Sequence, residues 1–179
     1  MTTRDINAGL RCIVYDAAVL AMALRKLRKP TNPENDLGRK TDQLAVEAAL
    51  IKYRSIMDFL TGTGTYPEDI KMSDFGEAPV TIAAANRRRF RTSVNKYAAH
   101  LTWQRTLKDS AVAEFPRPSA ILQYGPQLLQ DVRQFIDTQI AKGRKLNRYG
   151  KRYYAKLQEC MKQECSTIAS GVRASRRVP

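Results

Sequence analysis

The chain has 179 residues, the size of one ordinary domain, and its 43% hydrophobic and 27% charged residues are typical of a folded soluble protein. A mean hydropathy of -0.46 and the lack of an uninterrupted apolar run of about 18 residues argue against a membrane-spanning chain. We therefore expect one cytoplasmic domain over residues 1–179, with no signal peptide. Thirty-one Lys and Arg residues against seventeen Asp and Glu residues give a net charge of +14, which predicts a polyanionic partner, most often nucleic acid.

The positive charge is concentrated in the second half of the chain. Residues 1–90 have fourteen basic and eleven acidic residues, whereas residues 91–179 have seventeen and six. We therefore expect the binding surface in the second half. The three cysteines, Cys12, Cys160 and Cys165, form no C-x-x-C pair, and there is one histidine, so we expect no disulfide framework, no metal site and no other cofactor.

Apolar residues recur at helical spacing from Ile6 to Leu27, which predicts a first helix over about residues 4–29. Pro30 and Pro33 end it, and the polar residues through Asn35, Asp36 and Gly38 indicate a loop. The apolar positions of this helix are Ile6, Leu10, Ile13, Val14, Ala17, Leu20, Ala21, Leu24 and Leu27.

A second helix is expected from a cap at Thr41 to an end at Gly62 and Gly64. Its expected core face consists of Leu44, Ala48, Ile51, Ser55, Ile56, Phe59 and Leu60. The connection from Thr61 to Pro79 has no sustained period, and it contains one expected helical turn around residues 68–75.

A third long helix is predicted from Pro79 or Val80 to about Lys108. Its core stripe is expected to consist of Phe90, Val94, Tyr97 and Leu101, which fall close together on a helical wheel.

A fourth helix is expected to begin at Gly125-Pro126, because proline favours the first helical position. Its apolar residues are Leu128, Leu129, Val132, Phe135, Ile136 and Ile140. Gly143 separates it from a fifth amphipathic pattern formed by Leu146, Tyr149, Tyr153, Leu157, Cys160, Met161 and Ile168. A frayed basic tail is expected after about residue 170, and the whole pattern predicts an all-α bundle of four or five long helices.

The segment from Thr138 to Gln158 has no acidic residue and combines basic residues with tyrosines. The basic residues are Lys142, Arg144, Lys145, Arg148, Lys151, Arg152 and Lys156, and the tyrosines are Tyr149, Tyr153 and Tyr154. Cationic side chains neutralise phosphates and tyrosine rings stack on unpaired bases, so this segment is a candidate for nucleic-acid contact. The alternative is a solvated basic helix face whose tyrosines belong to the core.

A second basic cluster, Arg87, Arg88, Arg89 and Arg91, lies near the start of the predicted third helix, where the helix dipole favours anions. These arginines are candidates for binding phosphate. In the alternative interpretation they pair with the acidic residues of the preceding loop, which are Glu68, Asp69, Asp74 and Glu77.

His100 is the only side chain whose ordinary pKa lies near neutrality, so acid or base chemistry at physiological pH would use it most economically. The alternative is a packed, hydrogen-bonded structural histidine.

The segment 95–105, N-K-Y-A-A-H-L-T-W-Q-R, resembles the N-K-x-x-A-H-L-T-x-x-R signature of uncharacterised bacterial proteins. Asp58-Phe59-Leu60 and Ser73-Asp74-Phe75 resemble upstream landmarks of the same family, and the match covers roughly residues 45–105. The chain is also similar to divergent members of the HEPN superfamily (higher eukaryotes and prokaryotes nucleotide-binding domains). That resemblance implies a helical bundle that dimerises and, when active, cleaves RNA without metal.

The superfamily signature has an arginine, four to six residues and then a histidine, whereas the corresponding positions here are Ser93, Val94 and Asn95. Residue by residue, the resemblance implies His100 as acid or base and Asn95 at the first motif position, with Lys96 beside it. Cleavage of RNA through its own 2′-hydroxyl needs a base, an acid and a cation at the phosphorus. A two-fold dimer would supply two copies of His100, with Lys96 or Arg105 as the cation.

Our first hypothesis is thus an HEPN-like helical protein that engages RNA in preference to DNA, with metal-independent endoribonuclease activity in a toxin or defence system as its catalytic form and a homodimer as its assembly. The alternative is a non-catalytic module that binds nucleic acid or an acidic partner protein. A structural bundle with merely solubilising charge is a third reading, and it predicts no salt-dependent binding to RNA or DNA.

Overall fold

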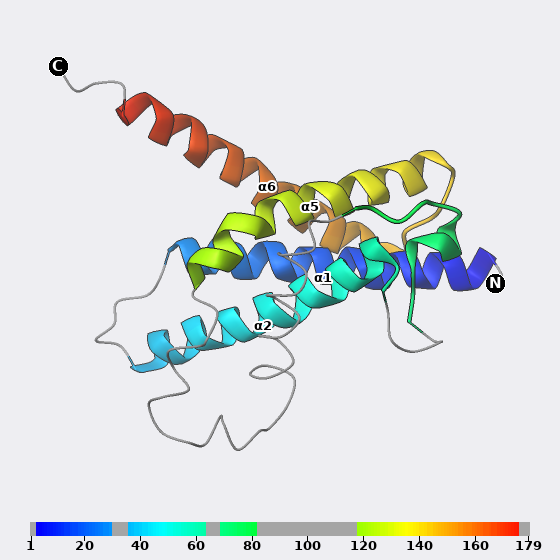
Figure 1. Ribbon diagram of the computed structural model, residues 1–179, viewed down its shortest axis with the longest axis horizontal. Helices are drawn as coiled ribbons and strands as arrows, with labels where there is room; N and C mark the ends of the chain where they lie inside the picture. Colours follow the sequence, from blue (N-terminus) through cyan, green and yellow to red (C-terminus); the bar gives the residue numbers. More distant parts are fainter. Residues whose placement is uncertain (1–2, 30–35, 64–68, 82–117, 176–179) are drawn as a thin grey trace.

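The computed structural model describes residues 3–29, 36–63, 69–81 and 118–175. In these ranges the chain forms four α-helices, one short 3-10 helix and no strand (Figure 1). The elements are α1 (Thr3–Arg28), α2 (Asp36–Thr61), η1 (Met72–Phe75), α5 (Pro118–Ala141) and α6 (Arg148–Ser175). The all-α prediction is therefore confirmed for this part of the chain.

Helix α1 lies at the centre of the bundle and packs against α2, α5 and α6. Its bounds agree with the predicted first helix, and α2 returns alongside it in the opposite direction (Figure 1). The buried apolar residues of α1 are Leu10, Ile13, Val14, Ala17, Ala18, Leu20, Ala21, Ala23 and Leu24. Burial of this many positions is expected of a helix with neighbours on three sides, while Cys12 and Tyr15 remain exposed.

Length and composition alone would allow one helix among the described residues, Asp5–Arg28, to cross a membrane. Half of its most apolar window is buried inside the bundle. Core helices of soluble proteins and signal sequences both pass the same test of length and composition.

Helix α2 begins at Asp36, so the predicted loop through Asp36 and Gly38 is wrong. Thr41 lies inside the helix rather than at its cap, and its Oγ1 donates a hydrogen bond to the Leu37 carbonyl at 2.8 Å. The predicted end is confirmed at Gly62, whose N–H donates to the Phe59 carbonyl at 3.3 Å.

The predicted core face of α2 is only partly correct. Ile56, Phe59 and Leu60 are buried, whereas the Leu44 and Ile51 side chains are 65% and 43% exposed. Ser55 of the predicted face is also exposed, and Ala48 is half-buried. The other buried apolar residues are Val46, Ala49, Leu50, Tyr53 and Met57. Two apolar stripes run along this helix, and the one that contacts α1 and α5 is rotated from the one that we predicted.

The connection after α2 contains η1, within the turn predicted at residues 68–75. Phe75 of η1, Phe59 of α2 and Phe135 of α5 meet edge to face, with ring centroids 4.9 to 5.9 Å apart. Aromatic pairs favour this arrangement, and here it fixes η1 on the bundle.

The third predicted helix has only its first residues in the described ranges. Residues 79–81 are not helical, and the Val80 N–H donates to the Leu60 carbonyl at the end of α2, at 2.8 Å. A helix start at Pro79 or Val80 is therefore wrong, and residues 82–108 lie outside the described residues.

Helix α5 begins at Pro118, earlier than predicted, and contains Pro126 in its interior. Pro126 cannot donate the hydrogen bond to the Leu122 carbonyl, but Ile121 and Leu129 on either side are fully buried and hold the neighbouring turns in place. Its predicted core face is confirmed, with Leu128, Leu129, Val132, Phe135 and Ile136 buried.

Helix α6 begins after Asn147, whose side-chain oxygen accepts the Gly150 N–H at 2.8 Å in the manner of a helix cap. Leu157, Cys160 and Met161 are buried as predicted. The helix continues to Ser175, beyond the predicted start of a frayed tail near residue 170, and its last part extends past the other helices (Figure 1).

Candidate nucleic-acid interface

The connection between α5 and α6 is held in place by hydrogen bonds at both of its ends. Gly143 has a φ of 82°, which favours glycine, and the Arg144 N–H donates to the Gln139 carbonyl at 3.1 Å. The Lys145 N–H donates to the Asn7 side chain of α1 at 3.2 Å. These contacts fix the direction in which the chain enters α6.

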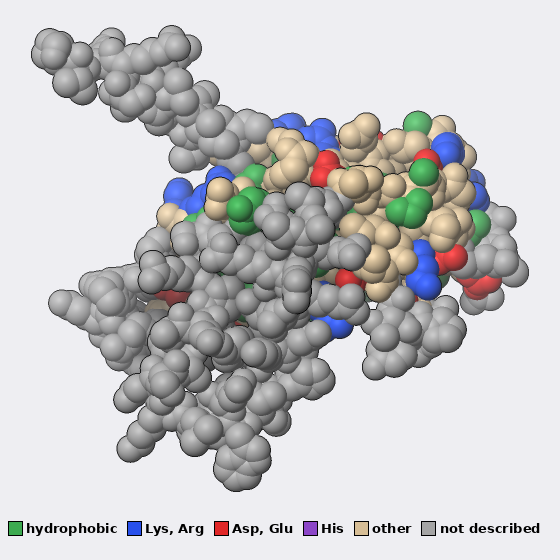
Figure 2. All heavy atoms as spheres, in the orientation of Figure 1, with side chains coloured by type: hydrophobic (Ala, Val, Ile, Leu, Met, Phe, Trp, Pro, Cys, Tyr) green, Lys and Arg blue, Asp and Glu red, His purple; other side chains and the backbone are tan. Residues whose placement is uncertain are grey.

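Seven basic residues, which we call the basic stripe, follow this connection into the first turns of α6. They are Lys142, Arg144, Lys145, Arg148, Lys151, Arg152 and Lys156. Figure 2 shows basic side chains in blue at the end of the molecule where α5 connects to α6. Five of the seven are exposed, and all seven lie on the connection or in the first turns of α6.

Three members of the stripe are held by other groups or partly buried. Lys142 pairs with Glu77 at 2.6 Å, and Lys156 pairs with Glu159 at 2.8 Å. Arg144 is half-buried, and its buried Nε has no hydrogen-bond partner among the described residues.

The other four, Lys145, Arg148, Lys151 and Arg152, are exposed. Their side chains form no ion pair with an acidic residue of the described ranges. Four positive charges that form no ion pair within the described ranges therefore lie within a short stretch of surface, an arrangement that attracts anions.

Several basic residues elsewhere in the bundle are paired instead. Lys52 bridges from α2 to Asp16 of α1 at 2.6 Å, and Asp16 also accepts the Ser55 hydroxyl at 2.7 Å. Lys26 pairs with Asp42 at 2.8 Å. Because these lysines already pair with carboxylates, they are less available to an anionic ligand than Lys145, Arg148, Lys151 and Arg152, which form no ion pair within the described ranges.

The three tyrosines that lie among the basic residues, Tyr149, Tyr153 and Tyr154, differ in burial. The alternative interpretation, in which all three belong to the core, is therefore wrong for Tyr149. Tyr149 is 69% exposed. Tyr153 is half-buried and packs edge to face on Tyr15 of α1, with ring centroids 5.0 Å apart, and Lys52 lies 5.2 Å from the Tyr15 ring centroid. Two aromatic rings thus lie on α6 close to Arg152, one of the four cations that form no ion pair within the described ranges.

Tyr154 is the exception, because its hydroxyl donates a hydrogen bond to Asp137 of α5. Partial burial, together with this bond to Asp137 and the charge of its carboxylate, raises the pKa of Tyr154 above its ordinary value. Tyr154 therefore joins α6 to α5 rather than facing a ligand.

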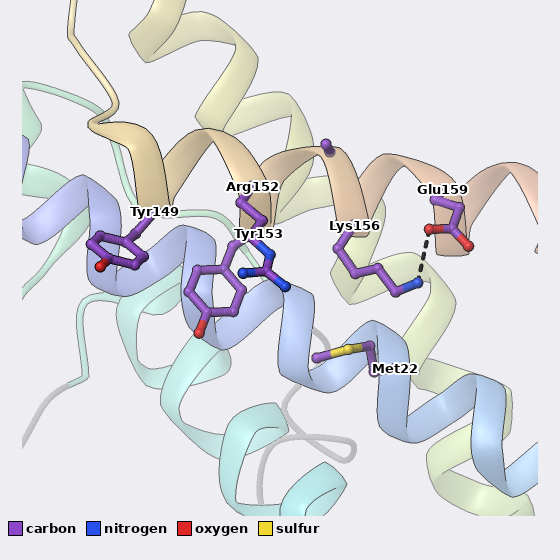
Figure 3. Close-up of a pocket in the computed structure, with 7 residues that line it drawn as sticks. Met22, Tyr149, Arg152, Tyr153, Lys156 and Glu159 are labelled. Atoms are coloured by element: carbon purple, nitrogen blue, oxygen red, sulfur yellow. Dashed lines mark hydrogen bonds and ion pairs between the residues drawn. The ribbon is translucent and has the colours of Figure 1, made fainter.

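A groove of about 610 Å³ runs between α6 and α1, beside the stripe. Figure 3 shows its labelled lining residues, with Tyr149, Arg152, Tyr153 and Lys156 along α6 above Met22 of α1. The lining consists of Met22, Tyr149, Arg152, Tyr153, Ala155, Lys156 and Glu159.

Glu159 closes one end of this groove. Lys156 donates to one of its carboxylate oxygens at 2.8 Å and Arg25 of α1 to the other at 3.3 Å. The hydrogen bond from Lys156, followed by the charges of Lys156 and Arg25, lowers the pKa of Glu159 below its ordinary value.

Sequence reasoning missed Glu159, Met22 and Arg25 as members of this site. Glu159 ends the acid-free segment and lies two helical turns after Arg152, a spacing that places both on one helix face. Met22 and Arg25 carry no such signal, because only the packing of α1 on α6 brings them there.

The loop before the arginine cluster has described partners of its own. Glu77 accepts hydrogen bonds from Gln139 at 2.7 Å and Lys142 at 2.6 Å, and Asp74 accepts the Lys71 backbone N–H at 2.8 Å. Glu77, which the alternative interpretation paired with the arginine cluster, thus forms a salt bridge with Lys142 of the basic stripe. The predicted arginine cluster itself lies outside the described residues, and its members are Arg87, Arg88, Arg89 and Arg91.

The residues proposed for catalysis also lie outside the described residues; they are His100, Asn95, Lys96 and Arg105. Within the described ranges no group of three or more His, Cys, Asp or Glu side chains could hold a metal ion.

Comparison of the chain with protein-family models, with curated proteins and with solved structures gives no match.

Proposed function

We propose that this protein binds nucleic acid through the basic stripe and the tyrosines beside it, and that RNA is preferred to DNA. The observation that carries the proposal is the set of four exposed cations, Lys145, Arg148, Lys151 and Arg152, that form no ion pair within the described ranges. Phosphate contacts by such side chains supply most of the affinity of non-specific nucleic-acid binding.

The position of the tyrosines supports nucleic acid over a general acidic partner. Tyr149 and Tyr153 lie on the same face as Arg152, one turn of helix apart. Cations that follow a phosphate backbone, combined with rings that stack on bases, are the usual means of holding a single strand. An acidic protein surface would use the cations but not the rings.

Salt dependence tests the proposal. The double variant Lys151→Gln/Arg152→Gln removes two of the four cations, and each phosphate contact on a single strand contributes about 0.7 to the slope of log K against log salt concentration. We expect the slope for a fluorescently labelled RNA single strand to become shallower by about 1.4, as measured by anisotropy.

The matched control is Lys29→Gln/Lys71→Gln, which removes two charges outside the basic stripe. This control keeps the slope close to that of the unmodified protein. Equal slopes for both double variants would show that the stripe does not contact phosphates, and the proposal would then be abandoned.

Endoribonuclease activity, an HEPN-like fold, a homodimer and a cytoplasmic location remain predictions from the sequence. The residues proposed for catalysis lie outside the described ranges. The binding proposal does not depend on them, because it rests on α6 and its connection to α5.

A further inference from the structure

The groove between α6 and α1 is lined by aromatic rings, cationic side chains and one carboxylate, which follow one another along α6. Tyr149 lies at one end, Tyr153 with Arg152 beside it and then Lys156 follow along α6, and Glu159 lies at the other end (Figure 3). The α6 residues from Tyr149 to Glu159 extend over about 15 Å of helix. This length exceeds one nucleotide but is well below the roughly 34 Å turn of a duplex.

Tyr153 gives the groove a rigid aromatic wall. Its ring is held edge to face against Tyr15, with an interplanar angle of 84°, and Lys52 lies over the Tyr15 ring. Tyr149, one turn earlier, is mostly exposed. A base can stack on such a ring only when its own face is free, which favours an unpaired strand.

Glu159 has acceptor capacity left after its two ion pairs. Arg25 donates to Oε1 and Lys156 to Oε2, whereas an ionised carboxylate offers about four acceptor positions. Its side chain is 47% exposed, so the remaining positions can reach a ligand. A carboxylate accepts from an exocyclic amino group of a base, as Glu and Asp do from cytosine N4.

From this order we infer that the groove binds unpaired nucleotides, with one base stacked on Tyr149, the next phosphate at Arg152, and the amino group of a second base at Glu159. The inference rests on the proposed nucleic-acid binding. It adds that the bound strand is unpaired and that the groove distinguishes between bases. Uracil has a carbonyl oxygen where cytosine has its amino group, and that oxygen faces a carboxylate unfavourably. The groove therefore favours cytosine over uracil.

The test compares fluorescently labelled oligocytidine and oligouridine of equal length, with an RNA duplex as a third probe. We expect the unmodified protein to bind oligocytidine about five- to tenfold more tightly than oligouridine. Glu159→Gln lowers this ratio to about one, because an amide can either accept from cytosine or donate to uracil.

The control for the charge change is Asp131→Asn on α5, outside the groove lining, which leaves the cytosine-to-uracil ratio unchanged. An unchanged ratio in Glu159→Gln would overturn the assignment of Glu159 as the group that distinguishes the bases.

Stacking is tested separately with Tyr149, which is exposed and can be replaced without opening the core. Tyr149→Ala weakens binding of both single strands about tenfold, while Tyr149→Phe keeps the affinity because the ring remains. Equal affinities for unmodified protein and Tyr149→Ala would overturn the stacking step.

The outcomes separate the inference from the proposed function. If the unmodified protein binds duplex and both single strands equally, with a steep salt dependence, nucleic-acid binding stands and the groove inference falls. If it binds none of the three probes at low salt, both fall.

Discussion

Tyr53 of α2 is a buried tyrosine whose ionisation can be followed directly. Its side chain is 2% exposed, and burial, followed by the nearby Tyr124 and Asp131, raises the pKa of Tyr53 from 10.0 to about 12. The folded state therefore holds this hydroxyl neutral more strongly than the unfolded state does. The resulting stability is fully present below the unfolded pKa and is lost as the pH rises from 10 toward 12.

We predict that Tyr53→Phe removes a tyrosinate absorbance step near pH 12 from an ultraviolet titration of the folded protein. Tyr149→Phe, which replaces an exposed tyrosine, should leave that late step in place. Loss of an early step rather than the late one in Tyr53→Phe would contradict the assigned environment of this residue.

His100 is the residue on which the predicted catalytic activity depends. If two copies of His100 provide the acid and the base, His100→Ala abolishes RNA cleavage by the purified protein in EDTA, because no other side chain of the chain has an ordinary pKa near neutrality. Gel analysis of mixed RNA, with the oligomeric state measured on the same preparation, checks this. Cleavage that persists in His100→Ala would remove the histidine from the mechanism, and intact RNA with both proteins would favour the binding module.

Helix α2 shows how far a helical pattern alone could predict an element. The helix and its end at Gly62 were predictable, because apolar spacing and a glycine are local signals. The buried face was not, because Leu44 and Ile51 form a second apolar stripe that remains exposed. The choice between the two stripes depends on where α1 and α5 pack, and no pattern within α2 records that.

The start of α5 was predicted incorrectly, because the local sequence contains two prolines that could begin a helix and only the packing decides between them. Gly125-Pro126 is a typical helix start, but the structure uses Pro118 for that purpose. Gly125 is needed instead for close packing, since a Cβ there would lie 2.7 Å from Leu24 Cδ1 and 3.0 Å from Leu24 Cδ2. Leu24 is fully buried, so its side chain has little room to move away.

We therefore predict that Gly125→Ala destabilises the protein by roughly 1–2 kcal/mol in urea unfolding, because the cost of overpacking exceeds the helix propensity gained by alanine. Gly150→Ala is the matched comparison on α6. The atoms nearest to a Cβ there would belong to the half-buried Leu146 and Arg11 side chains, at 3.3 to 3.4 Å.

The comparison variant should destabilise the protein less than Gly125→Ala does, because Gly150 is also buried but the atoms nearest to its Cβ would lie at 3.3 Å rather than 2.7 Å. If Gly125→Ala were as stable as the unmodified protein, α1 and α5 would not approach as closely as the structure indicates.

For the molecule as a whole, charge and composition were the sequence's most useful guides. The acid-free segment predicted the basic stripe, and the structure places its exposed cations on one stretch of α6 and the preceding connection. The groove beside it was not predictable, since it depends on the contact between Glu159 and Arg25, which are far apart in sequence. Likewise, the apolar composition of α1 reflects its central position among three helices.

The most direct test of the account is the salt dependence of binding between the unmodified protein and a labelled RNA single strand. The four exposed cations without ion pairs in the described ranges, each meeting one phosphate, predict that log K falls linearly with log salt concentration with a slope of about -3 or steeper. Absence of binding at low salt, or binding that does not change with salt, would contradict the proposal that the basic stripe holds a phosphate backbone.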